Sequence, residues 1–283
     1  MIPSLAGLHF LITYGCSAEC AHCFLWGSPA RFAAMGADQI DDFLQQTVAV
    51  GTIKEVCAEG GESFTRYDVL LHFLRRATAL GLKASALTNA SWVRSRRQAE
   101  QQIAELMAAG LANLGISTDQ WHQQFIPVSR VDTLLEVCSG AGLPAARMET
   151  TIEGVMFRGR AAARLAAAHA TRRPEELTAC PHEKLDAPSR CHLDCYGLLH
   201  LCQGLTLGPL PITQALAAYD PAGHPIVRLL FDGGPLALAR FAAGFGFALA
   251  PHYADACHLC YLAREFLRPR FPDLLGPDEM YGL

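Results

Sequence analysis

Three cysteines lie close together near the start of the chain, directly after an apolar, strand-like stretch. Cys16, Cys20 and Cys23 occupy the run Cys-Ser-Ala-Glu-Cys-Ala-His-Cys that follows residues 8–14. Three thiolates can bind three irons of a four-iron cluster and leave the fourth iron open to a ligand from outside the protein, whereas closed clusters use four cysteines. The spacing therefore predicts an iron–sulfur site in the loop after the first strand.

Zinc and a disulfide are the competing interpretations of these cysteines. A tetrahedral zinc site would need His9 or His22 as a fourth ligand, and structural zinc sites usually use two separated pairs of ligands. A disulfide is disfavoured because residues 1–7 lack the basic region and cleavage site of a secretory signal. Eleven cysteines in such a chain favour metal ligation in a reducing compartment. We therefore expect a cytoplasmic protein.

Composition narrows the classes of partner. Of the 283 residues, 51% are hydrophobic, and the mean hydropathy is +0.18. No apolar run reaches the roughly 18 residues of a membrane span, so we expect no membrane insertion. The net charge is −4, with no basic stripe that would attract a polynucleotide. We therefore expect neither a membrane nor a nucleic acid as partner.

The first half of the chain alternates strand and helix patterns. Apolar, β-rich runs predict strands at residues 8–14, 53–58, 83–87, 111–117 and 146–152. Helical periodicity predicts helices at residues 38–51, 67–80, 94–110 and 131–140, with Asp38 as the first N-cap. This alternation predicts an α/β fold with parallel βαβ units, in which functional loops follow the carboxyl ends of strands.

A second motif, Glu59-Gly60-Gly61-Glu62, ends the second predicted strand. Two glycines allow a ligand to approach the backbone closely, and the Glu62 carboxylate can accept from an ammonium group. By itself the motif is weak evidence for a ligand site, because a Gly-Gly turn between strand and helix more often only ends the strand.

Together, the Cys-x3-Cys-x2-Cys loop and the Gly-Gly-Glu motif resemble the radical S-adenosylmethionine (radical SAM) enzymes. The resemblance implies a partial (β/α)6 TIM-like barrel and a 4Fe-4S cluster on Cys16, Cys20 and Cys23. It also implies that the open iron binds the amino and carboxylate groups of SAM, and that Gly60, Gly61 and Glu62 hold the amino group. Ser63 replaces the family's usual proline.

Less specific matches to the family imply further residues around SAM. Asn89 lies in a Thr-Asn-Ala run after the third strand, where the family often has Thr-Asn-Gly. Ser117 and Asp119 follow the fourth strand, where polar side chains of the family contact the ribose or carboxylate. His22 holds a position that is commonly aromatic and packs near adenine. Ordinary turn chemistry also explains the residues after the two strands.

Charged residues on and after the fifth strand have two interpretations each. Arg147, beside Glu149, faces either the barrel mouth, where we expect it to contact SAM, or a solvent rim. The guanidinium groups of Arg158 and Arg160 suit a carboxylate of SAM or substrate, or else begin a solvated helix.

Six more cysteines follow an alanine-rich segment at residues 161–170 that is predicted to be helical. Their arrangement resembles the SPASM and twitch modules, which carry auxiliary clusters in radical SAM enzymes. That resemblance implies a second 4Fe-4S cluster on Cys180, Cys202, Cys257 and Cys260. Cys191 or Cys195 competes with Cys180, and structural zinc competes with iron because histidines lie nearby. We expect a radical SAM core at residues 1–165 and an auxiliary region at 166–283.

The family resemblance also implies the chemistry. SAM is cleaved reductively to a 5′-deoxyadenosyl radical that abstracts hydrogen from a substrate C–H, with electrons from an external donor such as flavodoxin or ferredoxin. Auxiliary clusters accompany peptide-modifying relatives, so we expect a ribosomally made peptide or protein as substrate. A small-molecule substrate is the alternative, because the first strand starts by Leu8 and leaves no room for a leader-binding domain. A non-catalytic iron–sulfur or zinc scaffold is the remaining alternative.

Overall fold

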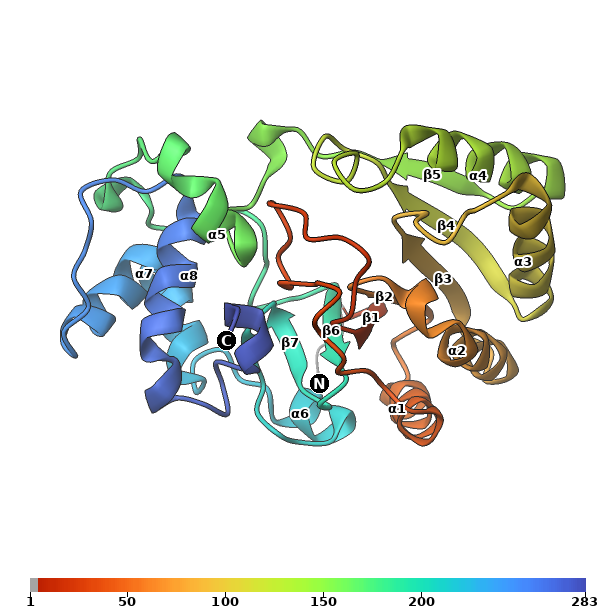
Figure 1. Ribbon diagram of the computed structural model, residues 1–283. Coiled ribbons are helices and arrows are strands. Elements are labelled where there is room, and N and C mark those ends of the chain that lie inside the picture. Colours follow the sequence, from red (N-terminus) through yellow and green to blue (C-terminus); the bar gives the residue numbers. More distant parts are fainter. Residues whose placement is uncertain (1–4) are drawn as a thin grey trace.

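An eight-stranded sheet organises the chain, and the computed structural model describes residues 5–283 of it (Figure 1). The strands lie in the order β5-β4-β3-β2-β1-β6-β7-β8. Those from β5 to β6 are parallel, while β7 and β8 continue the sheet antiparallel. The strands are β1 (Gly7–Thr13), β2 (Glu55–Gly60), β3 (Lys83–Thr88), β4 (Leu111–Ser117), β5 (Ala145–Met148), β6 (Arg190–Asp194), β7 (Leu199–Cys202) and β8 (Leu205–Thr206).

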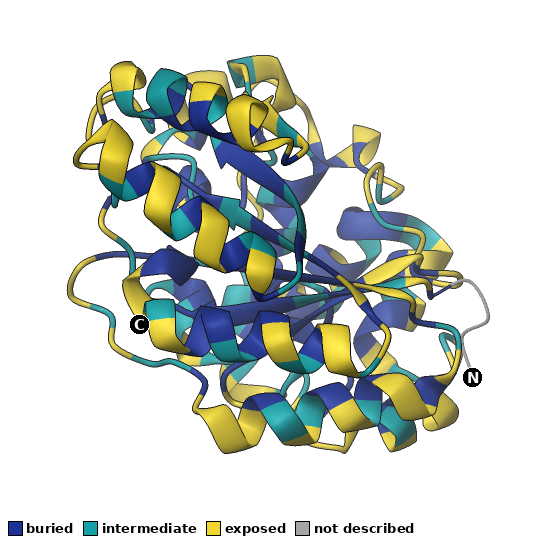
Figure 2. Cartoon of the chain, turned by 90° about the vertical axis from the view of Figure 1, so that its right-hand side faces the viewer, coloured by how far each residue is buried: buried dark blue, intermediate teal, exposed yellow. Residues whose placement is uncertain are grey.

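Four helices connect the first five strands and turn their buried sides to the sheet, with their exposed sides outward (Figure 2). They are α1 (Ala37–Val50), α2 (Tyr67–Ala79), α3 (Arg96–Ala108) and α4 (Val128–Ala141). In α1, for example, Ile40 and Leu44 are buried at i, i+4 spacing. The predicted strands and helices of this half are confirmed within a few residues. Asp38, predicted as N-cap, lies in the first turn of α1 instead, since the helix begins at Ala37 with Gly36 as its cap.

The C-terminal half departs more from the sequence patterns. The alanine-rich segment forms only a short helix, α5 (Arg160–Arg164), followed by a 3-10 turn at Ala166–His169. Two helices were not predicted, α6 (Ile212–Ala218) and α7 (Pro225–Ala243). The last helix, α8 (Ala256–Leu267), begins before Cys257, so both cysteines of its Cys-x2-Cys motif are helical. Among residues 5–283, no helix has the length and apolar character needed to cross a membrane.

Strand β6 pairs in parallel with β1, on the side opposite β2. The sheet therefore continues past residue 165, where the sequence analysis placed a domain boundary. Because β1 is flanked on both sides, its residues from Phe10 to Thr13 are all buried, as is typical of a central parallel strand. The loop that carries the first three cysteines starts from this central strand.

Candidate active site

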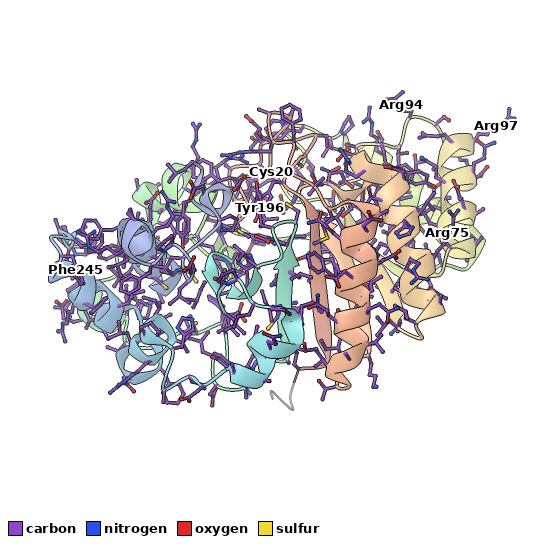
Figure 3. The ribbon with its side chains drawn as sticks, turned by 90° about the horizontal axis from the view of Figure 1, so that it is seen from below. Cys20, Arg75, Arg94, Arg97, Tyr196 and Phe245 are labelled. Atoms are coloured by element: carbon purple, nitrogen blue, oxygen red, sulfur yellow. The ribbon has the colours of Figure 1, made fainter. Side chains whose placement is uncertain are left out.

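A cavity of about 440 Å³ lies at the carboxyl ends of the first strands, and most of the predicted site residues line it. Cys20 lies near the middle of the molecule, between the helices of the barrel and the C-terminal helices (Figure 3). Of the residues predicted from the sequence, the lining contains Cys16, Cys20, His22, Cys23, Gly60, Gly61, Asn89, Ser117 and Asp119. Glu62 and Arg147 are absent from it.

The two glycines of the Gly-Gly-Glu motif allow β2 to approach the cysteine loop. Gly60 has a φ of +137°, and a Cβ on Gly61 would lie 2.1 Å from the carbonyl oxygen of Gly15. The Gly61 N–H donates to the Thr13 carbonyl at 2.7 Å, and the Glu62 N–H donates to that of Gly15 at 2.8 Å. The close approach made possible by these glycines is thus between two backbone segments, one of which carries Cys16.

Arg160 secures the other end of the same loop. Its backbone N–H donates to the Cys23 carbonyl at 2.8 Å, and its guanidinium donates to the carbonyls of Cys20 and Gly27 at 3.1 and 2.7 Å. The side chain is buried and lies over the Trp26 ring. Neither sequence interpretation of Arg160 foresaw this role, because the hydrogen bonds join residues more than 130 positions apart.

Glu62 is buried behind the cavity wall, where it connects β2 to the end of β3. One carboxylate oxygen accepts from the Thr88 hydroxyl and the Phe64 N–H, and the other accepts from the Asn89 N–H at 2.6 Å. Burial raises the pKa of Glu62 to about 7 despite these donors. Asn89 in turn places its amide nitrogen 3.6 Å from the Cys16 sulfur. The expected contact between Glu62 and SAM stays a prediction.

An aromatic and acidic group lies beside Cys20. His22 stacks on Trp121 with 4.6 Å between ring centroids, and its Nε2 lies 3.2 Å from Asp119. Burial opposes the charge of Asp119, but His122 and His22 hold its pKa well below the usual range. Trp121 and His122 were missed in the sequence, although they directly follow the Ser-Thr-Asp run that ends β4. The buried Nδ1 of His22 has no hydrogen-bond partner among the described residues.

Arg147 is not brought to the cavity. It lies on β5, the edge strand, and its guanidinium pairs with Asp132 of α4 at the surface. Of the two interpretations of this charge, the solvent rim is the one that matches the geometry.

The thiols of the first loop suit metal ligation. Burial, with a contribution from Glu62, raises the pKa of Cys16 to about 12, and burial also raises that of Cys20. Such thiols lose their protons when a metal supplies the compensating charge. The clustering of three thiols on one wall, with the Asn89 amide directed at one sulfur, fits an iron–sulfur cluster.

The four C-terminal cysteines chosen from the sequence line a second cavity, of about 30 Å³. They are Cys180, Cys202, Cys257 and Cys260. The two competing cysteines lie elsewhere: Cys191 is fully buried on β6 opposite Leu8 of β1, and Cys195 follows that strand. Neither lines this cavity.

Three separate elements bring these cysteines together. Cys202 ends β7, and Cys257 and Cys260 lie in the first turns of α8, which Asp255 caps by accepting from the His258 N–H at 2.7 Å. Cys180 is held by a break in α7. There Gly234 has a φ of +64°, and a Cβ on it would lie 2.2 Å from the Thr178 carbonyl carbon. The chain just before Cys180 therefore packs directly on the α7 backbone.

Two buried arginines accompany the four thiols. Arg158 donates to the Cys202 sulfur at 2.9 Å, and Arg264 lines the same cavity. Burial opposes both charges, yet the neighbouring cysteines, Cys202 for Arg158 and Cys260 for Arg264, raise the pKa of each guanidinium. The Nε atoms of both have no partner among the described residues. Buried cations with spare donors fit an anionic four-thiolate cluster.

Arg158 also lines the first cavity and lies over Phe24, the residue after Cys23. It is 4% exposed, so it is not the solvated residue of one sequence interpretation. Arg158 is therefore shared by the two cavities that contain the cysteines.

The floor of the first cavity carries a polar group that the sequence analysis did not single out. Glu59 lies with its two carboxylate oxygens 3.0 Å from His9 Nδ1 and 2.9 Å from His192 Nε2. Its position directly before the Gly-Gly-Glu motif was the only available signal, since the two histidines come from β1 and β6.

The sequence model of the Radical SAM superfamily matches residues 10–161, more than half of the chain. The protein therefore belongs to the radical SAM superfamily and is a radical SAM enzyme, a family whose members carry a 4Fe-4S cluster and bind SAM. This confirms the family predicted from the two sequence motifs. The SPASM or twitch module is not part of this match.

Individual proteins extend the comparison. The chain is 24% identical over 121 residues to a protein of Bacillus subtilis (strain 168) named "Putative peptide biosynthesis protein YydG"; the match covers 43% of this chain and 38% of the relative. The crystal structure of BtrN in complex with AdoMet and 2-DOIA aligns with a TM-score of 0.52 and 10% identity, over 82% of this chain and 89% of BtrN. SuiB of Streptococcus suis bound to S-adenosylmethionine aligns with a TM-score of 0.40 and 12% identity, over 83% of this chain and 67% of SuiB. The BtrN alignment confirms the predicted α/β partial-barrel class.

Proposed function

We propose that this radical SAM enzyme modifies a ribosomally made peptide or protein with the help of two iron–sulfur clusters. The observation that carries the proposal is the buried Arg158, which lines both cysteine-bearing cavities and donates to Cys202. Two metal-competent sites on either side of one side chain are the arrangement expected when electrons pass between a SAM cluster and an auxiliary cluster.

In this proposal, Cys16, Cys20 and Cys23 bind the catalytic 4Fe-4S cluster. When bound, that cluster supplies the electron that cleaves SAM to the radical that removes a substrate hydrogen. The chain positions SAM with the backbone of Gly60 and Gly61 and with the side chains of Asn89, Ser117 and Asp119, while His22, backed by its stacking on Trp121, offers an aromatic face to adenine.

The second cluster of the proposal is held by Cys180, Cys202, Cys257 and Cys260, which converge on one cavity beside Arg158 and Arg264. These ligands lie in the region 166–283, the proposed auxiliary region, and the proposed core ends near residue 165. The continuous sheet from β1 to β8 joins the two regions.

The substrate class rests on the similarity to YydG, whose name refers to peptide biosynthesis. An external flavodoxin or ferredoxin supplies electrons in this proposal. None of the eleven cysteines forms a disulfide, which supports a reducing compartment such as the cytoplasm.

Anaerobic reconstitution tests the proposal in two stages. The wild type with SAM and a reductant should release 5′-deoxyadenosine, and it should carry about eight irons and no stoichiometric zinc. The second stage adds short peptides encoded next to the enzyme and follows their masses. A specific mass change in one peptide supports the peptide substrate.

Two results would contradict the proposal. About four irons with one zinc would assign the C-terminal cysteines to structural zinc. Modification of a small molecule, with every neighbouring peptide left unchanged, would replace the peptide substrate.

A further inference from the structure

Four polar side chains on the floor of the first cavity are used by neither cysteine site. They are His9 of β1, Glu59 of β2, His192 of β6 and Gln203, which follows β7, and all of them line the 440 Å³ cavity. Glu59, His192 and Gln203 are each less than 8% exposed. We call these four residues the floor cluster.

Glu59 gives the floor cluster a negative charge. Burial alone would raise its pKa, but His192 and His9 hold that pKa well below its usual range. Burial lowers the pKa of His192, and the neighbouring Glu59 carboxylate opposes that shift. Of the two arginines that line the cavity, Arg158 donates to Cys202, and Arg190 is exposed at the start of β6.

Two buried acceptors of the floor cluster lack donors among the described residues. They are Oε1 of Glu59 and Oε1 of Gln203. His192 Nε2 is 2.9 Å from the Glu59 oxygen, and it also lies 3.2 Å from Gln203 Nε2, so it is within reach of both side chains. One imidazole N–H can satisfy at most one of the two oxygens. Buried acceptors without donors are rare, and one that remains unsatisfied on residues lining a cavity indicates a ligand that supplies N–H or O–H groups.

Building on the proposed function, we propose that the floor cluster binds a protonated primary amine of the substrate. An ammonium group brings three N–H donors and a positive charge, which match an ionised carboxylate and an amide oxygen. The same chemistry is offered by a lysine side chain of a peptide and by the amino group of a small molecule. The floor cluster then orients the substrate within the cavity that the three cysteines also line.

Two matched pairs of probes test this site in the reconstituted enzyme with SAM bound. The peptide pair is acetyl-Gly-Lys-Gly-amide and its Nε-acetyl-lysine form, and the small-molecule pair is glucosamine and N-acetylglucosamine. Calorimetry should show that the amine of one pair binds about tenfold or more tightly than its acetylated partner, as for a charge-assisted hydrogen bond. The pair that shows the preference identifies the source of the amine.

Variants of the floor cluster should remove this preference. Glu59→Gln should abolish it, and Gln203→Met should reduce it several-fold. Glu55→Gln is the matched control: it lies on the same strand, is exposed and faces Lys83 outside the cavity, so the preference should be unchanged. If Glu59→Gln fails to fold, the result with Gln203→Met decides.

The inference is overturned if the amine and its acetylated partner bind equally tightly in both probe pairs. It is also overturned if Glu59→Gln keeps the full preference for the amine. If Glu59→Gln does not fold, a full preference in Gln203→Met overturns it instead. One equivalent of zinc that Cys57→Ala removes would also overturn it, because His9, Cys57 and Glu59 have ligand atoms within 4.8 Å of one another. The proposed function is judged separately, by 5′-deoxyadenosine release and iron content in the wild type without probes.

Discussion

The N-terminal cysteines share one loop between Cys16 and Cys23, whereas the C-terminal cysteines come from a coil, the end of β7 and the start of α8, between Cys180 and Cys260. The first loop follows the central strand of the sheet, and the backbones of Gly61 and Arg160 anchor it. The second group depends on the packing of α7 against the segment before Cys180. A site within one loop needs little tertiary structure to bring its ligands together, while a site built from distant segments must await the fold.

The two sites also differ in charge compensation. No arginine is hydrogen-bonded to a sulfur of the first loop among the bonds described, where Asn89 approaches Cys16 instead. The second site has Arg158 and Arg264 beside its thiols. At the first site, a neutral amide lies beside three thiolates, which is consistent with an open catalytic cluster. At the second site, two cations lie beside four thiolates, which is consistent with a closed electron-transfer cluster.

The largest expected effect is the loss of SAM cleavage when the first cysteine site is removed and the second is kept. Replacing Cys16, Cys20 and Cys23 together by alanine should abolish 5′-deoxyadenosine formation and remove about four of about eight irons. The C-terminal cluster should keep its electron paramagnetic resonance signal. Cys138→Ala, buried in α4, is the control and should keep full activity. Continued SAM cleavage in the triple variant would refute the catalytic role of the loop.

The second effect tests the C-terminal ligand set. Cys257→Ala should lose about four irons and still cleave SAM, because the proposed function assigns radical generation to the other site. Cys191→Ala, at a fully buried position near the start of β6, should retain all of its iron. Loss of iron in Cys191→Ala, together with normal iron in Cys180→Ala, would show that one member of the set is wrong.

A smaller effect concerns the pH dependence of the first site. The pKa of Glu62 is about 7 in the folded protein against an ordinary 4.5, so the native state keeps a proton that the unfolded chain releases between these values. The contribution of Glu62 to the free energy of unfolding should therefore be greatest below pH 4.5 and should fall as the pH rises to 7. Relative to Glu62→Gln, the wild type should lose up to about 3 kcal/mol over this range.

Urea unfolding of the cluster-free proteins from pH 4.5 to 8 measures this loss. Glu55→Gln, which replaces an exposed carboxylate at the start of β2, should track the wild type. Parallel curves for wild type and Glu62→Gln would mean that Glu62 is ionised as easily in the fold as in water.

The smallest effect concerns Arg158. Replacing it with methionine removes a cation and a hydrogen bond from beside Cys202, which should lower the reduction potential of the C-terminal cluster. A shift of about 60 mV, equal to about 1.4 kcal/mol for one electron, is the expected size. A redox titration followed by electron paramagnetic resonance measures it, with the surface variant Arg172→Met as control. An unchanged potential would limit Arg158 to packing.

Local sequence was sufficient for the first half of the fold and the first cysteine site. The periodicity of β1 to α4 is set by residues near one another in the chain, and so is the spacing from Cys16 to Cys23. Their elements and family could be predicted because neighbouring residues alone determine which side chains share a face. The resemblance to auxiliary-cluster modules also selected the four C-terminal cysteines that the structure brings together.

Tertiary structure alone decided where distant segments meet. The pairing of β6 with β1 buries Cys191 and delivers His192 to Glu59, and nothing in the local pattern of residues 190–194 specifies that neighbour. The same holds for Arg158 and Arg160, whose partners lie far along the chain, and for Arg147, which the edge position of β5 turns to the surface. Long-range partners depend on the packing of whole elements, and periodicity within one element does not encode them.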